Sequence, residues 1–228
     1  MADRPILFSA QMVRALLDGS KTQTRRRAKF VSREPGLNMG FSGLHASQPR
    51  PGCWVLLSKS RSCWEDRTQM WRCPYGVPGD TLWVRETLKW NDADAVWQYG
   101  ADAANVPELS LLCRPTPTRW PKGVCVSMWM PRGASRIALD ITNVRVERLQ
   151  DISESDAQAE GCARLVMDDD GKCYESERGT YRTGYAGLWD HINGAGAWDA
   201  NPWVVALSFE IRTVNAAETG SAALEPVA

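Results

Sequence analysis

The segment Gly19-Ser20-Lys21-Thr22-Gln23-Thr24-Arg25-Arg26 places an amine and a hydroxyl three residues apart among several cations. A threonine hydroxyl becomes a nucleophile when a neighbouring base takes its proton. Lysine acts as that base only where its pKa falls well below the roughly 10.4 of a free side chain, and nearby arginines favour such a fall. The spacing therefore indicates a site for a polar or anionic substrate, with Thr24 as nucleophile and Lys21 as base. The alternative is a solvated basic loop that follows a helix.

A second group able to do chemistry is Glu86, in the run 81–88 that follows the turn residues Pro78-Gly79-Asp80. The run alternates as a β-strand does, which puts Glu86 on the same face as Leu82, Val84 and Leu88. A carboxylate on a core-facing row is costly unless a cation or a hydrogen-bond donor reaches it, so we expect a polar partner that points inward. The alternative is that Glu86 lies at a strand end in contact with water.

The elements that must position Lys21 and Thr24 are a short strand and a helix just upstream. Residues 6–8 predict the strand, and Ser9 suits the cap of a helix whose apolar stripe contains Met12, Val13, Leu16 and Leu17. Gly19 ends that helix. Both candidate groups then lie beyond the helix, so a turn has to bring them together.

The rest of the chain alternates between segments that predict regular structure and segments rich in turn residues. Residues 31–77 and 89–131 are expected to be insertions, the first opening with a loop or hairpin rich in Gly, Ser and Pro and the second broken by prolines. A bent strand is expected over 135–148, and helices are expected over 153–161 and 185–192. The last strand is expected over 203–211, followed by a disordered tail over 214–228. Together they predict a single domain over 1–213.

Charge is balanced overall but not locally. The 228 residues carry 27 lysines and arginines against 27 aspartates and glutamates, which argues against a bulk coat of nucleic acid. Residues 14–33 are basic and 151–177 are acidic, and a local basic patch can still hold a few phosphates. Neither a membrane-spanning apolar run nor the hydrophobic core of a signal sequence is present, so a cytoplasmic protein without membrane contact is expected.

The first insertion holds cysteines and tryptophans whose roles stay open. Seven cysteines without an export signal are expected to be reduced thiols. With no C-x-x-C pair, a zinc site is the weaker alternative, built from Cys53, Cys63, Cys73, Cys113 and Cys125. Trp64 and Trp71 are expected to pack the insertion, with base stacking as the alternative.

Taken together, four motifs make the chain resemble an ASCH-domain protein of the bacteriophage and prophage type. They are Arg4-Pro5-Ile6-Leu7-Phe8-Ser9, Gly19-x-Lys21-x-x-Thr24-x-Arg26, Pro-Gly-Asp-x-Leu-Trp-Val-Arg-Glu over 78–86, and Asn201-Pro202-Trp203. Segments 152–161 and 184–193 also fit, so the resemblance covers residues 4–212. ASCH domains are β-barrels related to the PUA fold. The resemblance therefore implies an α+β domain built on a PUA-like β-barrel, with flanking short helices and the two insertions.

Some small bacterial members of this family are amidohydrolases that remove the acetyl group from N4-acetylcytidine with a threonine, a lysine and a glutamate. The motifs match these three to Thr24, Lys21 and Glu86. The family more often has glutamate at the position of Thr24, so threonine favours the amidohydrolase subgroup. The resemblance thus implies hydrolysis of an N4-acylated cytosine nucleoside, or a related modified base, without a metal or another cofactor. It also implies substrate contacts by Phe8, Ser9, Arg26, Trp83 and Asn201.

Two other functions stay open at this point. The same pocket would serve an RNA- or modified-base-binding module that lacks hydrolytic chemistry. A phage RNase is a third option, for which the sequence gives no metal cluster and no histidine pair, since His45 and His191 are the two histidines of the chain and lie far apart in it. The expected partner is a modified nucleoside or a small nucleobase derivative, with RNA as the alternative.

Overall fold

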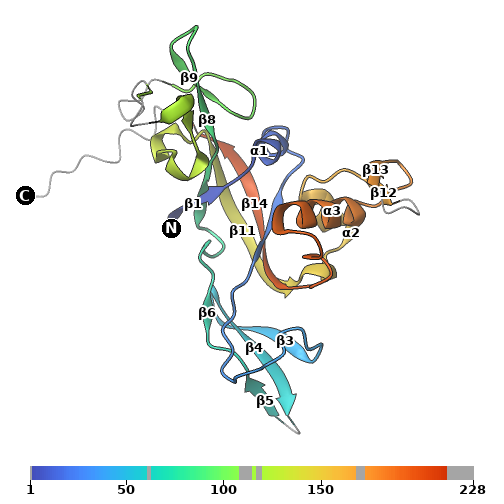
Figure 1. The fold of residues 1–228 in the computed structure, drawn as a ribbon. Helices are drawn as coiled ribbons and strands as arrows, with labels where there is room; N and C mark the ends of the chain where they lie inside the picture. The colour runs from blue at the N-terminus through green and yellow to red at the C-terminus, as the bar shows by residue number, and fades with distance from the viewer. Residues whose placement is uncertain (1, 61–62, 108–114, 117–119, 168–172, 215–228) are drawn as a thin grey trace, which may run out of the picture. The chain divides into compact units, whose positions relative to one another are not determined.

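The computed structural model describes residues 2–60, 63–107, 115–116, 120–167 and 173–214 (Figure 1). The chain divides into two compact units: the first comprises Met1–Gly19, Gly79–Asp140 and Glu210–Ala228, and the second comprises Ser20–Pro78 and Ile141–Phe209. The regular elements of the described residues are mostly strands, with three short α-helices, which makes this an α+β protein as expected. The strands lie in four sheets, none of which closes into a barrel within the described residues, so the PUA-like β-barrel stays a prediction. Apart from Val214, the predicted disordered tail lies outside the described residues, as does Cys113.

The first unit is built on three paired strands. Strand β1 (Asp3–Leu7) runs parallel to β7 (Thr81–Arg85), and β7 pairs antiparallel with the start of β11 (Ile137–Arg148). Helix α1 (Ala10–Leu17) follows β1, and Ser9 caps it as predicted, because its hydroxyl accepts a hydrogen bond from the backbone N–H of Met12. The interior consists of apolar side chains from these elements: Ile6, Val13, Leu16, Leu82, Val84, Ile137 and Leu139.

The region predicted as the second insertion has a small sheet of its own. Its strand order is β10 (Val124–Cys125), β8 (Leu88–Asn91) and β9 (Val96–Tyr99). The short 3-10 turn η1 (Pro121–Gly123) precedes β10 in the chain, and the turns η2 (Ser127–Trp129) and η3 (Arg132–Ala134) come after it. Leu88, Trp97, Tyr99, Cys125 and Met130 belong to its core. A region with a core of this kind is a structured element rather than a loop.

The strand predicted over 81–88 is broken in the structure. Strand β7 ends at Arg85 and β8 begins at Leu88, in a different sheet. At the break, the backbone N–H of Glu86 lies 3.1 Å from the sulfur of Met130, and the backbone N–H of Gly100 donates to the carbonyl of Thr87. Glu86 therefore occupies a junction between two strands, although it is buried as the alternation predicts.

In the second unit, β2 (Gln23–Arg27) pairs antiparallel with β14 (Trp203–Thr213), so that Thr24 lies opposite Leu207, and β14 also neighbours β11. The sequence predicts that alternate residues of β14 are buried, but in the structure the residues between them are buried too. Val204 and Ala206 are as buried as Val205 and Leu207, so the strand is covered on both faces.

Three elements of the second unit pack around one core. They are the turn η4 (Leu149–Asp151), helix α2 (Glu154–Ala159) and helix α3 (Tyr181–Asn193), and their core includes Leu149, Ile152, Ala157, Tyr185 and Trp189. Ser153 caps α2 as predicted by accepting a hydrogen bond from the backbone N–H of Asp156. The hairpin β12 (Leu165–Met167) and β13 (Cys173–Glu175) precedes α3.

The region predicted as the first insertion contains four strands, which we call the β-arm. Strand β4 (Cys53–Ser60) pairs antiparallel with β3 (Leu44–Arg50), β5 (Cys63–Asp66) and β6 (Trp71–Arg72). A bulge interrupts β3 between Ser47 and Arg50. Trp71 packs against Phe30 as expected for a packing residue, whereas Trp64 is exposed.

Candidate functional site

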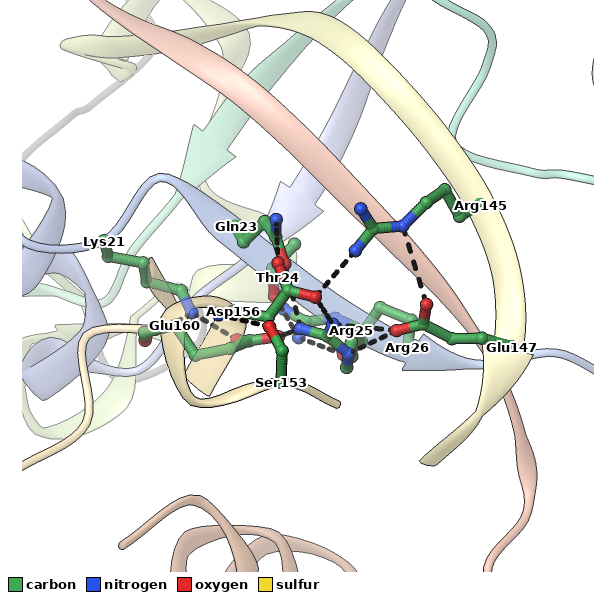
Figure 2. Close-up of polar contacts among 10 residues, drawn as sticks. All are labelled: Lys21, Gln23, Thr24, Arg25, Arg26, Arg145, Glu147, Ser153, Asp156 and Glu160. Atoms are coloured by element: carbon green, nitrogen blue, oxygen red, sulfur yellow. Dashed lines mark hydrogen bonds and ion pairs between the residues drawn. The ribbon is translucent and has the colours of Figure 1, made fainter. Parts of the chain in front are cut away.

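Lys21 lies two residues before β2, and its side chain is fully buried. Its Nζ donates hydrogen bonds to Oε2 of Glu160 at 2.7 Å and to the carbonyl oxygen of the same residue at 2.9 Å (Figure 2). Glu160 is the C-cap of α2, and an isolated β-bridge joins its backbone to that of Lys21. A buried charge is costly unless it is paired and hydrogen-bonded, and Glu160 provides both interactions.

Arg25 lies on the same row of side chains and is also fully buried. Its guanidinium contacts Glu147 at 2.7 Å, Asp156 at 3.0 Å and Glu160 at 3.3 Å, as Figure 2 shows. Burial disfavours its charge, but Glu160 and Glu147 outweigh that cost, so the pKa of Arg25 is raised. Glu160 therefore joins Lys21 and Arg25 in one buried ionic network.

Asp156 ties a third cation and an amide into this network. Burial raises its pKa, but a hydrogen bond from Gln23 and the charges of Arg145 and Arg25 prevail, so that the pKa of Asp156 is lowered. The Gln23 amide donates at 2.9 Å and the Arg145 guanidinium at 2.9 Å. The Asp156 carboxylate therefore stays ionised at a lower pH than an ordinary aspartate does.

Thr24 and Arg26 lie on the other face of β2. Successive side chains of a strand point to opposite faces, and Gln23 and Arg25 both contact Asp156 of α2. The Thr24 hydroxyl, fully buried, instead accepts a hydrogen bond from Nη1 of Arg26 at 2.9 Å. Residues 21–24 lead into the extended strand β2 without a turn. The prediction that a turn brings Lys21 and Thr24 together is therefore wrong. Within the described part of the second unit, no hydrogen bond joins Lys21 Nζ to Thr24 Oγ1.

Glu86 belongs to the first unit, and the inward-pointing partner predicted for it is Arg136. The two side chains form a double hydrogen bond, Nε to Oε1 at 2.9 Å and Nη2 to Oε2 at 3.0 Å. Arg136 also binds Asp102 at 2.7 Å and lies 3.9 Å from the ring centre of Tyr99. Burial raises the pKa of Glu86 and outweighs the opposing effect of Arg136, and burial raises the pKa of Tyr99 to about 12.

Replacing Arg136 with methionine is expected to raise the pKa of Glu86 further, because the variant loses the hydrogen bonds and the charge that lower it. A carboxyl whose pKa is higher in the folded chain binds more protons when folded, so the free energy of unfolding falls as pH rises from the unfolded pKa through the folded one. NMR titration of the Glu86 carboxyl carbon measures the shift. Arg132→Met, which removes an arginine paired with Asp3, is the control. A Glu86 titration that Arg136→Met leaves unchanged would contradict the assignment.

The residues implied as substrate contacts have structural contacts of their own. In the first unit, Phe8 is buried, Ser9 caps α1, and buried Trp83 has the Arg85 guanidinium 4.5 Å from its ring centre. In the second unit, Asn201 has a positive φ of 41°, and its side-chain oxygen accepts the backbone N–H of Gln150 at 2.9 Å. These contacts give Ser9 a capping role and Asn201 a turn-stabilising role.

Sequence reasoning missed the groups that hold the candidate residues in place. They are the partners in the two networks: Glu147, Asp156 and Glu160 in the second unit, and Asp102 and Arg136 in the first. A signal was available, since any buried cation or carboxylate needs a counter-charge. That signal predicts the existence of a partner but not its position in the chain.

The described residues contain neither a candidate metal centre nor a candidate membrane-spanning helix. No group of three or more His, Cys, Asp or Glu side chains there could hold a metal ion, and Cys53, Cys63, Cys73, Cys125 and Cys162 are not joined in disulfides. No helix in these ranges is both long and apolar enough to cross a membrane.

No protein-family model, curated protein or solved structure matches the chain. The contacts that bear on chemistry are the buried Lys21–Glu160 pair and the Thr24 hydroxyl beside Arg26.

Proposed function

We propose that the protein is a metal-independent amidohydrolase of the ASCH, PUA-like type, which removes the acyl group from N4-acetylcytidine or a related acylated cytosine nucleoside in the cytoplasm. The observation that carries the proposal is the fully buried Lys21, with its ammonium on the carboxylate of Glu160, three residues from the buried hydroxyl of Thr24. A hydroxyl and an amine within one short segment are the groups that covalent acyl transfer without a metal requires.

In the proposed reaction, Thr24 Oγ1 attacks the acyl carbonyl carbon. Arg26 Nη1 already donates to this oxygen, so its charge favours the alkoxide and the negative oxygen that develops on the carbonyl. The bond between the acyl carbon and N4 then breaks, which releases the free cytosine amine and leaves an ester on Thr24. Water hydrolyses that ester and restores the hydroxyl.

The proton of Thr24 passes to the Lys21–Glu160 pair. Lys21 has to lose a proton before it can accept one, and the Glu160 carboxylate 2.7 Å away is the group that receives it. Because Lys21 points to the side of Arg25 and Glu160 while Thr24 lies on the other face of β2, the transfer needs a chain of waters or a rotation of the Lys21 side chain toward Thr24. The pair gives this proton up to the leaving amine as the bond between the acyl carbon and N4 breaks. That Glu86 relays this proton stays a prediction from the sequence. Burial raises the pKa of Glu86, and a raised pKa suits a carboxyl that donates a proton.

The alternative of an RNA-binding module rests on the basic run over 21–29, and the structure weakens that basis. Lys21 and Arg25 are buried in ion pairs with carboxylates, whereas Arg27 and Lys29 are exposed. A buried, paired cation does not neutralise a phosphate backbone. The run thus offers fewer cations to RNA than its sequence indicates, and we favour the hydrolase.

The experiment that tests the proposal incubates the purified protein with N4-acetylcytidine and other N4-acylated cytosine nucleosides in the presence of a chelator. Chromatography follows the free amine. Release of cytidine is expected, with a cytidine acylated only on a ribose hydroxyl as the control for general esterase activity. A folded protein that releases amine from no N4-acylated member of the panel would contradict the proposal.

A further inference from the structure

The β-arm has two unlike faces. Residues paired directly across neighbouring strands point to the same face, and alternate residues of one strand also share a face. One face of β4 carries Trp54, Leu56 and Ser58, which are all buried. The other face, which we call the outer face, carries Cys53, Val55, Leu57 and Lys59 together with their partners on β3, β5 and β6.

An exposed aromatic ring lies near one end of the outer face. Lys59 pairs with Trp64, whose side chain is 53% exposed. His45, on the same face through its pairing with Leu57, places its ring edge-on to the Trp64 ring with centroids 5.1 Å apart. Tryptophan offers a large apolar surface, so an indole left open to water is unusual where packing alone determines its position.

Cations lie at both ends of this face. Arg50 and Arg72 both pair with Cys53, one from each side of β4, and Lys59 lies six residues further along the strand. All three are exposed, and among the described residues none of them takes part in an ion pair or a side-chain hydrogen bond. The acid on this face, Asp66, lies 3.7 Å from Arg33. The outer face is therefore positive on a chain whose net charge is zero.

We propose that the outer face of the β-arm binds single-stranded nucleic acid. Trp64 stacks on a base with His45 at its edge, and Lys59, Arg50 and Arg72 contact phosphates on either side. A stacking ring flanked by cations is how proteins bind single strands with little sequence preference. Val55 in the middle of the outer face is buried. The nucleic acid therefore contacts the two ends of the outer face and does not lie in a continuous groove. An acidic protein segment would use the cations but would give the exposed indole no role.

The test titrates the full chain into fluorescently labelled, unstructured RNA and DNA oligonucleotides of one length, with anisotropy read at two salt concentrations. Binding that weakens as salt rises is expected, because phosphate contacts release counterions. Trp64→Ala is expected to weaken it about tenfold, the scale of one stacked base. Trp129→Ala, which removes a 66% exposed tryptophan of the first unit, is the matched control and is expected to leave binding unchanged. Comparison of the affinities for RNA and for DNA identifies the preferred nucleic acid.

A second pair of variants tests the cations separately. Lys59→Gln is expected to reduce the dependence of affinity on salt, and the exposed Lys89→Gln is its control. Absence of binding at low salt, or equal affinity of Trp64→Ala and wild type, would overturn the proposal. Polyglutamate binding as tight as oligonucleotide binding and unaffected by Trp64→Ala would assign the face to an acidic protein instead. None of these readouts requires hydrolysis, so failure here and failure of the proposed reaction are distinguishable.

Discussion

Replacing Arg25 with methionine is expected to lower the free energy of unfolding by about 3–5 kcal/mol, the usual cost of removing one partner from a buried ion pair. The variant leaves Glu147, Asp156 and Glu160 around a fully buried position without the cation that binds all three. Methionine fills much of the volume of the arginine stem, so the loss reports charge more than packing. Denaturant unfolding at neutral pH measures it.

Arg27→Met is the matched control, because Arg27 lies two residues further along β2 and is exposed. Its expected effect is within about 0.5 kcal/mol. The difference between the two variants should shrink as pH falls through the lowered pKa of Asp156, since protonated carboxyls no longer need the guanidinium. Equal destabilisation by both variants would show that the network around Arg25 contributes little.

Lys21→Arg is expected to reduce the rate of hydrolysis by about 100-fold or more, the range that general acid–base groups contribute. Arginine keeps the positive charge but does not give up a proton, so it cannot accept one from Thr24. Steady-state kcat on the best N4-acylated substrate measures the loss. The exposed Lys29→Arg is the control and should keep the wild-type rate.

Because Lys21 is fully buried, the larger arginine can disturb the fold, so a second variant is needed. Glu160→Gln keeps the size of its side chain and removes the proton acceptor that contacts Lys21. It is expected to lower kcat, provided that circular dichroism confirms the fold. Folded Lys21→Arg with wild-type kcat would exclude proton transfer at position 21.

The elements that could be predicted from the sequence are those with local signals. Ser9 and Ser153 cap α1 and α2 as expected, because a cap depends on residues within one helical turn. The long strands β11 and β14 appear where alternation and β-branched residues predict them. Burial of Glu86 follows from the same alternation, although its strand ends one residue earlier.

The segment around Lys21 shows why the rest was not predictable. Gln23–Arg27 contains three arginines and has the composition of a loop, but pairing with β14 makes it a strand, and tertiary context of this kind overrides propensity. The partner of Lys21 is 139 residues away and that of Glu86 is 50 residues away. Charge complementarity requires such partners, but only the folded chain selects them.

The β-arm makes the same point for aromatic residues. Trp64 and Trp71 are alike in the sequence, and both are expected to pack. Strand pairing places Trp71 beside Trp54 and against Phe30, whereas Trp64 lies opposite Lys59 on the outer face. The pairing register, which the sequence leaves open, determines which tryptophan is free to bind a ligand.

The most direct test of the proposed hydrolase compares amine release from N4-acetylcytidine by wild type and by Thr24→Ala. We predict that the alanine variant loses turnover while remaining folded, since one buried hydroxyl that accepts a single hydrogen bond contributes about 1 kcal/mol to stability. Thr24→Ser should retain part of the activity, because it keeps the nucleophilic oxygen. Hydrolysis by Thr24→Ala at the wild-type rate would contradict the account.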